Sequence, residues 1–182
     1  MAELFTIGHS NRSIEAFIAL LQAAGITVVA DVRTIPKSRH NPQFNADALD
    51  ASLQAAGIGY RPMQALGGLR GKLKGAGPSP NGFWQNEAFR NYADYAGTPP
   101  FRQGLAELRA LGNTHRSAIM CAEALWWQCH RRIITDYLLA AGEDVTHILG
   151  EGKTEPARMT EAAVPGAGGT LTYPAAQGDL LL

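Results

Sequence analysis

The chain has 182 residues, of which 46% are hydrophobic and 18% charged. This composition is typical of one folded domain with its own core, and it excludes a disordered chain, a collagen and a disulfide scaffold. Lys and Arg balance Asp and Glu to a formal net charge of zero, so no overall field draws the chain to nucleic acid or to an anionic membrane.

The first elements along the chain predict a βαβ unit. Residues 4–7 form an apolar strand pattern, and residues 14–21 recur at helical spacing after two candidate capping residues, Ser10 and Ser13. Residues 27–32 are rich in β-branched side chains. A parallel crossover of this kind is nearly always right-handed and lays its helix on the sheet. The opening therefore favours an α/β fold.

Strands and helices continue to alternate along the rest of the chain. The pattern predicts further strands at 58–61, 117–121 and 145–149, and helices at 47–56, 87–95, 100–111 and 126–141. We expect an α/β fold with a mainly parallel sheet of about five strands and helices on both faces, in a Rossmann-like three-layer arrangement.

Two parts of the chain differ in composition. Residues 1–150 are predicted to form a single α/β domain. Residues 151–182 are rich in Gly, Ala and Pro, and we expect them to pack on the same domain as an extension, with an edge strand at 169–173.

The chain start lacks the basic and apolar segments of a signal peptide, and no apolar run approaches the roughly 18 residues that span a bilayer. We therefore expect a cytoplasmic protein without membrane contact, whose cysteines are reduced. The sequence leaves the oligomeric state open.

Polar side chains stand at the carboxyl ends of the predicted strands, where ligands of open parallel sheets bind. His9 follows the first strand, Asp31 and Arg33 end the second, and Cys121 and Glu123 end the fourth. Together they predict one crevice. The alternative is that Asp31 and Arg33 form a structural ion pair and that His9 bonds its own backbone in a turn.

The segment from Cys121 to Arg131 has three interpretations. As a metal site, Cys121, Cys129 and His130 supply ligand atoms, although their spacing matches no common zinc pattern. As a nucleophile, either cysteine becomes a thiolate near a histidine. In the interpretation that the sequence favours, Glu123 is a general acid or base, Arg131 binds an anion, and the cysteines pack around them.

Helical spacing places His130 on the apolar face of the predicted helix, beside Trp126 and Ile133. A buried core histidine is therefore the alternative to a catalytic one. Arg131 lies about 100° further round such a helix and reaches either the crevice or water.

The glycine-rich, basic segment 66–83 is expected to be mobile or ordered by a ligand. It is not a P-loop, because leucines replace the first glycine and the Ser or Thr of that motif, and no dinucleotide fingerprint follows the first strand. Arg70 and Lys72, with the aromatic side chains of Phe83 and Trp84, could hold a phosphate and stack a base. The alternative is a solvated lid.

Several motifs in order resemble one family. They are Thr6-Ile7-Gly8-His9-Ser10, Asp31-Val32-Arg33, Leu66-Gly67-Gly68, Cys121-Ala-Glu and Cys129-His130-Arg131. The chain resembles the DUF488 family from about residue 4 to residue 150. The family name denotes a domain of unknown function, so the resemblance implies site residues without a reaction. Those residues are His9, Ser10, Asp31, Arg33, Glu123, Cys129, His130 and Arg131.

The sequence thus predicts an enzyme, a hydrolase or group transferase without an organic cofactor, that acts on a small anionic or nucleotide-like substrate. The predicted catalytic residues are Glu123, His9, Asp31, Cys129 and His130, and the predicted anion-binding residues are Arg33, Arg131, Ser10, Arg70 and Lys72. One alternative is a nucleotide or nucleic-acid binding module without catalysis. The other is a metal or redox protein that uses Cys121, Cys129 and His130.

Overall fold

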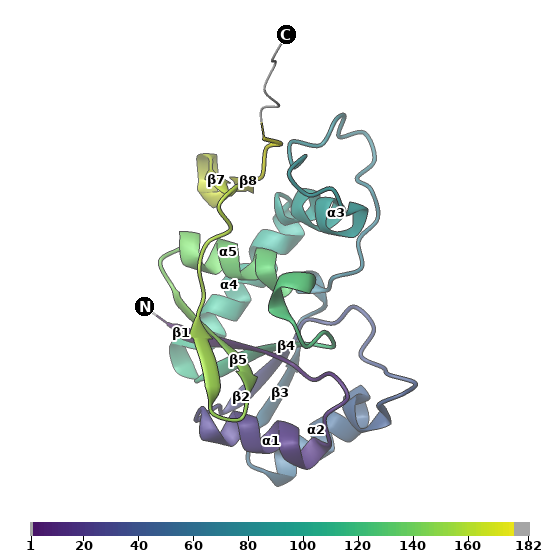
Figure 1. Cartoon of the computed structure of the whole chain (residues 1–182), viewed down its shortest axis with the longest axis vertical. Coiled ribbons are helices and arrows are strands. Elements are labelled where there is room, and N and C mark those ends of the chain that lie inside the picture. The colour runs from purple at the N-terminus through teal and green to yellow at the C-terminus, as the bar shows by residue number, and fades with distance from the viewer. Residues whose placement is uncertain (1, 177–182) are drawn as a thin grey trace.

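A computed structural model of the chain describes residues 2–176, and its centre is a six-stranded sheet (Figure 1). The strands are β1 (Glu3–Gly8), β2 (Val28–Asp31), β3 (Gly59–Pro62), β4 (Ser117–Cys121), β5 (Asp144–Gly150) and β6 (Lys153–Pro156). Their order across the sheet is β3-β2-β4-β1-β5-β6. Strands β1 to β5 are parallel to one another, and β6 is antiparallel to β5. The predicted mainly parallel sheet is confirmed.

Helices cover both faces of this sheet (Figure 1). The helices α1 (Ile14–Ala23) and α2 (Ala46–Ala55) cover one face, and α3 (Glu87–Ala96), α4 (Pro99–Thr114) and α5 (Arg131–Ala140) lie on the other. Each face has its own buried apolar cluster. The arrangement is compatible with a Rossmann-like three-layer fold, as the sequence predicted.

Strand alternation decides which side chains face α5. In β4, Ala118 and Met120 join the cluster under α1 and α2, whereas Ile119 and Cys121 join the cluster under the other helices. This period of two is the ordinary geometry of a strand. Cys121 is therefore the last side chain of β4 on the face that α5 covers.

The predicted helix at 126–141 is wrong in its first turn. Trp126–Gln128 is a 3-10 turn, Cys129 has an extended backbone with φ −133° and ψ 153°, and α5 begins at Arg131. An extended residue cannot continue a helix, so Trp126 and His130 do not share one helical stripe. The break at Cys129 instead leaves its sulfur beside the first amide of α5.

The C-terminal extension forms its own small sheet, in which β7 (Val164–Pro165) pairs with β8 (Leu171–Thr172). The strand expected at 169–173 is therefore not an edge of the main sheet, which ends at β6 instead. Leu171 and Tyr173 are buried against the α5 face. Residues 177–182 of the expected extension lie outside the described residues. Within residues 2–176, no helix is both long enough and apolar enough to span a membrane.

Candidate active site

The ends of β1 and β4 pack directly against one another, and Gly8 makes this approach possible. A Cβ atom at Gly8 would lie 1.9 Å from the carbonyl oxygen of Glu123. The amide of His9 donates to the carbonyl of Cys121 at 2.9 Å, and the amide of Ser10 donates to that of Ala122 at 3.0 Å. Because only glycine fits here, the Gly-His-Ser and Cys-Ala-Glu motifs run side by side past the end of the sheet.

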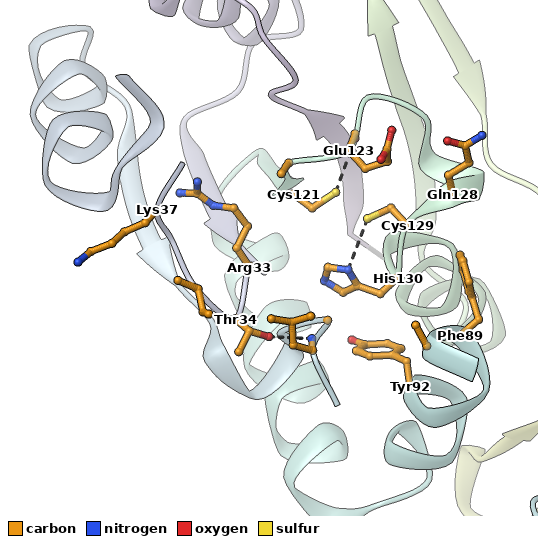
Figure 2. A pocket seen from close by; sticks show the side chains of 15 residues that line it. Arg33, Thr34, Lys37, Phe89, Tyr92, Cys121, Glu123, Gln128, Cys129 and His130 are labelled. Atoms are coloured by element: carbon orange, nitrogen blue, oxygen red, sulfur yellow. Dashed lines mark hydrogen bonds between the residues drawn. The ribbon is translucent and has the colours of Figure 1, made fainter. Parts of the chain in front are cut away.

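A pocket of about 320 Å³ opens beyond the carboxyl ends of β2 and β4 (Figure 2). Five segments line it: Arg33, Thr34, Ile35 and Lys37 after β2; Gly68 and Leu69; Ala88, Phe89 and Tyr92 of α3; Cys121, Ala122 and Glu123 after β4; and Gln128, Cys129 and His130 before α5. Four of the ten predicted site residues, namely Arg33, Glu123, Cys129 and His130, therefore meet in one cavity, together with Cys121. Its size suits a small molecule.

Asp31 and Arg33 form the ion pair that the sequence allowed as an alternative. The carboxylate of Asp31 accepts from Nε of Arg33 at 2.9 Å, from Nη2 at 2.7 Å and from the hydroxyl of Tyr60 at 2.6 Å. Nη1 of Arg33 lies 3.4 Å from Nε2 of His9. Tyr60 lies beside this ion pair, and Asp31 and Tyr60 together raise the pKa of Arg33. Arg33 thus lines the pocket as one member of an ion pair.

His9 is held in a single orientation behind Arg33. Its Nδ1 lies 2.8 Å from the carbonyl of Ser10, which can only accept, so Nδ1 carries the proton and Nε2 accepts from Arg33. The ring stacks on Phe44 at 4.2 Å. Burial lowers the pKa of His9, and the charge of Arg33 lowers it further. His9 and Ser10 lie outside the pocket lining, so the structure gives His9 a supporting position rather than contact with a guest.

His130 is the histidine that faces the pocket. Its Nε2 lies 2.7 Å from the carbonyl oxygen of Val32 and must donate to it, which leaves Nδ1 of the neutral ring as an acceptor 3.5 Å from Sγ of Cys129. Gly68 packs against the ring so closely that a Cβ there would lie 2.5 Å from Nδ1. Tyr92 contacts the ring edge-on at 5.1 Å. The ring is thus fixed in a position to take a proton from the Cys129 thiol.

Arg131 does not have the position of an anion clamp, because its side chain is only 1% exposed and does not line the pocket. Its Nε donates to Sγ of Cys121 at 3.0 Å, Nη1 donates to Oγ1 of Thr6 at 3.1 Å, and Nη2 donates to the carbonyl of Glu123 at 2.6 Å. Among residues 2–176, no carboxylate forms an ion pair with it. A buried cation of this kind stabilises any anion beside it, and the acidic groups beside Arg131 are thiols.

The two thiols differ in their ionisation. Burial would raise the pKa of Cys129, but hydrogen bonding with Cys121 and the charges of His130 and Arg131 outweigh it and hold that pKa well below its ordinary value. The backbone amide of Arg131, at the positive end of α5, also donates to this sulfur at 3.4 Å. Burial and the neighbouring Cys129 raise the pKa of Cys121. These causes favour the thiolate form at Cys129 and the neutral thiol at Cys121.

Two charged side chains stand on opposite sides of the pocket in Figure 2, Glu123 after β4 and Lys37 after β2. Both are exposed. Glu123 was a predicted site residue, whereas Lys37 was not, although its place in the polar loop after a strand end was an available signal. Thr6 and Gly68 were also missed as parts of the site. Each acts through contacts that no spacing rule reveals.

The predicted basic loop does not contribute to this pocket. The guanidinium of Arg70 donates to the carbonyls of Gln64 and Gly67 and lies 3.8 Å above the ring centre of Tyr95. Lys72 lines a different cavity, between the loop and the C-terminal extension. The site assignment of these two residues is therefore corrected.

The aromatic part of the base-stacking interpretation is also wrong for Trp84. Its side chain is only 6% exposed and stacks on Phe89 at 5.0 Å, in contact with Tyr173. Phe83 packs against the same cluster. Neither ring presents a free face on which a base could stack.

The metal interpretation gains no support from the side chains. Within residues 2–176, no group of three or more His, Cys, Asp or Glu side chains is placed to hold a metal ion. Nε2 of His130 is occupied by the carbonyl of Val32, and its Nδ1 faces Cys129. The two thiols and the imidazole contact one another rather than a common centre.

Comparison with known proteins gives a family and no further relative. No curated protein matches the chain, and no solved structure matches it. Residues 13–138 match the profile of DUF488, a domain of unknown function, and this range spans α1 to α5 and includes both cysteines. The chain therefore belongs to the DUF488 family.

Proposed function

We propose that the chain is an enzyme in which the thiolate of Cys129 is the nucleophile, a hydrolase or group transferase for a small anionic substrate. The observation that supports it is the set of contacts of the Cys129 sulfur, which lies 3.5 Å from Nδ1 of His130 and accepts from the backbone amide of Arg131, the first amide of α5, at 3.4 Å. A histidine and a helix amino end beside a sulfur favour its thiolate. The proposal moves the central role from Glu123, which the sequence favoured, to Cys129.

The arrangement supplies a nucleophile with an oriented base. The thiol proton of Cys129 passes to Nδ1 of His130, and the carbonyl of Val32 accepts the Nε2–H and stabilises the resulting imidazolium. The thiolate then bonds to the electrophilic atom of the substrate, and the leaving group departs with its electron pair and takes the proton from His130. Water or another acceptor releases the group from sulfur, with Glu123 on the pocket wall placed to accept its proton.

The substrate is held by donors on the β2 side of the pocket. Arg33 supplies a guanidinium and Lys37 an exposed ammonium. Both side chains line the cavity on the side opposite Glu123 (Figure 2). Carboxylate and phosphate oxygens match such donors. Leu69 and Phe89 give the rest of the wall an apolar surface.

Two alkylating reagents of almost equal size test this proposal, because iodoacetate carries a negative charge and iodoacetamide does not. We expect both to modify Cys129 before Cys121, and we expect the ratio of the iodoacetate rate to the iodoacetamide rate to exceed that of the denatured chain. Lys37→Gln should lower this ratio by about threefold, whereas Lys72→Gln, in the other cavity, should leave it unchanged. Modification of Cys121 first, or a ratio equal to that of the denatured chain, would contradict the proposal.

A further inference from the structure

The proposed transfer reaction gives no role to Cys121, although its thiol lies at the centre of the site. Cys121 and Cys129 line the same pocket, and each thiol influences the ionisation of the other. Figure 2 shows their sulfur atoms pointing toward the same space. Arg131 contacts both: its Nε lies 3.0 Å from Sγ of Cys121, and its backbone amide lies 3.4 Å from Sγ of Cys129. A nucleophilic thiolate thus has a second thiol within reach of anything bound to it.

Arg131 also favours ionisation of the second thiol at a defined moment. While Cys129 is a thiolate, its charge raises the pKa of Cys121. Once the sulfur of Cys129 has formed a bond and lost that charge, the repulsion disappears and the guanidinium 3.0 Å away becomes the counter-ion of Cys121. Cys121 is then activated to attack the sulfur of Cys129, which is the role of a resolving thiol.

The charge of Arg131 also affects which oxidants can convert Cys121 and Cys129 to a disulfide. Because Arg131 stabilises the thiolate, it stabilises the reduced pair relative to a disulfide, and a pair of this type has an easily reduced disulfide. Small disulfides therefore oxidise it poorly. A hydroperoxide oxidises it readily, because cleavage of the O–O bond yields an alcohol and water.

We propose, on the basis of the nucleophilic Cys129 inferred above, that this site also reduces small apolar hydroperoxides, with Cys121 as the resolving thiol. The thiolate of Cys129 attacks the terminal peroxide oxygen and the O–O bond breaks. The alkoxide leaves with the electron pair and takes a proton from His130 to become the alcohol, while Cys129 becomes a sulfenic acid. Cys121 then forms an S–S bond to Cys129 and water leaves. An external dithiol reduces the disulfide and restores both thiols.

Side chains around the sulfurs suit this substrate class. The guanidinium of Arg33 is a donor group for the departing alkoxide oxygen, and Leu69 and Phe89 provide an apolar wall for its alkyl group. The leucine is 68% exposed, so the mouth of the pocket is apolar as well. The alkyl group of a hydroperoxide therefore fits this apolar part of the lining.

The test uses the reduced full chain, one equivalent of cumene hydroperoxide at neutral pH, alkylation of the remaining thiols, and mass spectrometry. We expect Cys121 and Cys129 to be lost together as one intramolecular disulfide, with an equal amount of cumyl alcohol formed and both thiols restored by dithiothreitol. The rate should exceed that of the denatured chain by at least about tenfold, because an ordinary thiol is only a few per cent ionised at neutral pH.

Two variants divide the reaction into its steps. Cys121→Ser, which keeps an acceptor for Arg131, should still form cumyl alcohol and stop at a sulfenic acid on Cys129 that dimedone traps. Cys129→Ser should leave Cys121 reduced. A wild-type chain that stops at the sulfenic acid, or that reacts no faster than the denatured chain, would overturn the proposal.

Alkylation of the same samples shows which proposal has failed, the resolving role of Cys121 or the nucleophilic role of Cys129. If Cys129 is alkylated rapidly at neutral pH while no disulfide forms with the hydroperoxide, the resolving role of Cys121 is wrong and the nucleophile stands. If Cys129 is alkylated no faster than in the denatured chain, the nucleophile itself is wrong.

Discussion

Two buried arginines lie at the same end of the sheet, and their surroundings are opposite. Arg33 forms an ion pair with Asp31 at 2.7 Å, so most of its charge is neutralised within the fold. Arg131 contacts Thr6, Cys121 and the carbonyl of Glu123, all of which are uncharged. Arg33 thus lies in the wall of the pocket with its charge paired. In the proposed function, the charge of Arg131 instead stabilises a thiolate.

The largest expected effect comes from Arg131→Met. This change removes a buried cation with all its hydrogen bonds and leaves the acceptors unpaired, which should cost about 4 kcal/mol in the free energy of unfolding. It should also return the pKa of Cys129 toward its ordinary value. Denaturant unfolding and alkylation against pH measure the two effects.

Arg132→Met is the matched control for that variant. Its guanidinium is half-buried, donates to Thr160 at 3.1 Å and lies 4.9 Å above the ring centre of Trp84, away from both sulfurs. We expect a loss of about 1 kcal/mol and unchanged alkylation of Cys129. Equal effects of the two substitutions on Cys129 would show that the guanidinium of Arg131 has no special role.

Asp31→Asn removes the charged partner of Arg33. It leaves Arg33 buried with a neutral partner, and we expect the free energy of unfolding to fall by about 3 kcal/mol. The pKa of Cys129 should stay below its ordinary value, since its causes lie on the side of Arg131. A loss of thiolate reactivity as large as in Arg131→Met would erase the distinction between the two arginines.

The pKa of His147 depends on its burial and on the charge of Arg131, and it affects stability in acid. Its Nδ1 lies 2.6 Å from Oγ1 of Thr6, which also accepts from Arg131, and burial together with the charge of Arg131 lowers its pKa to about 4. Because the folded pKa is below the unfolded value near 6.5, the neutral ring stabilises the fold above about pH 6.5. That stability is lost as the pH falls through about 4.

The wild type should therefore lose on the order of 3 kcal/mol more than His147→Asn between neutral pH and about pH 4. Urea unfolding at both pH values measures this difference, and His9, which is present in both chains, cancels from it. The same acid sensitivity in the two chains would mean that the fold does not lower the pKa of His147.

Gly68→Ala gives the smallest expected change in stability, about 1 kcal/mol, yet it should slow alkylation of Cys129 at neutral pH by about tenfold. The new Cβ would lie 2.5 Å from Nδ1 of His130 and must push the ring away from the sulfur. Gly71→Ala, where a Cβ meets nothing within 4 Å, is the control and should change neither quantity. If Cys129 is alkylated at the wild-type rate in the Gly68 variant, His130 does not take the proton of the Cys129 thiol.

The sequence predicted the sheet and the helix layers well, because those depend on local apolar periodicity. It missed β6, since residues 153–156 are polar and pair only as an edge strand next to β5. It also started the last helix too early, because Trp126 and Ile133 fit a helical stripe while Cys129 is extended.

The structure brings together only part of the predicted site. Strand-end geometry brings Arg33, Glu123, Cys129 and His130 to one pocket. The burial of Arg131 depends on Thr6 and on carbonyls of another loop, which no spacing rule contains. For the same reason the sequence could not distinguish a structural arginine from one that binds an anion.

The ultraviolet absorbance of the thiolate, measured against pH for the wild type and for Cys129→Ser, tests the central claim most directly. We predict that the difference between the two chains shows one thiolate that persists well below the ordinary thiol pKa of about 8.5, and that the Cys129→Ser chain shows none at neutral pH. A wild-type thiolate that disappears at or above about pH 8.5, or one that remains in Cys129→Ser, would contradict the account.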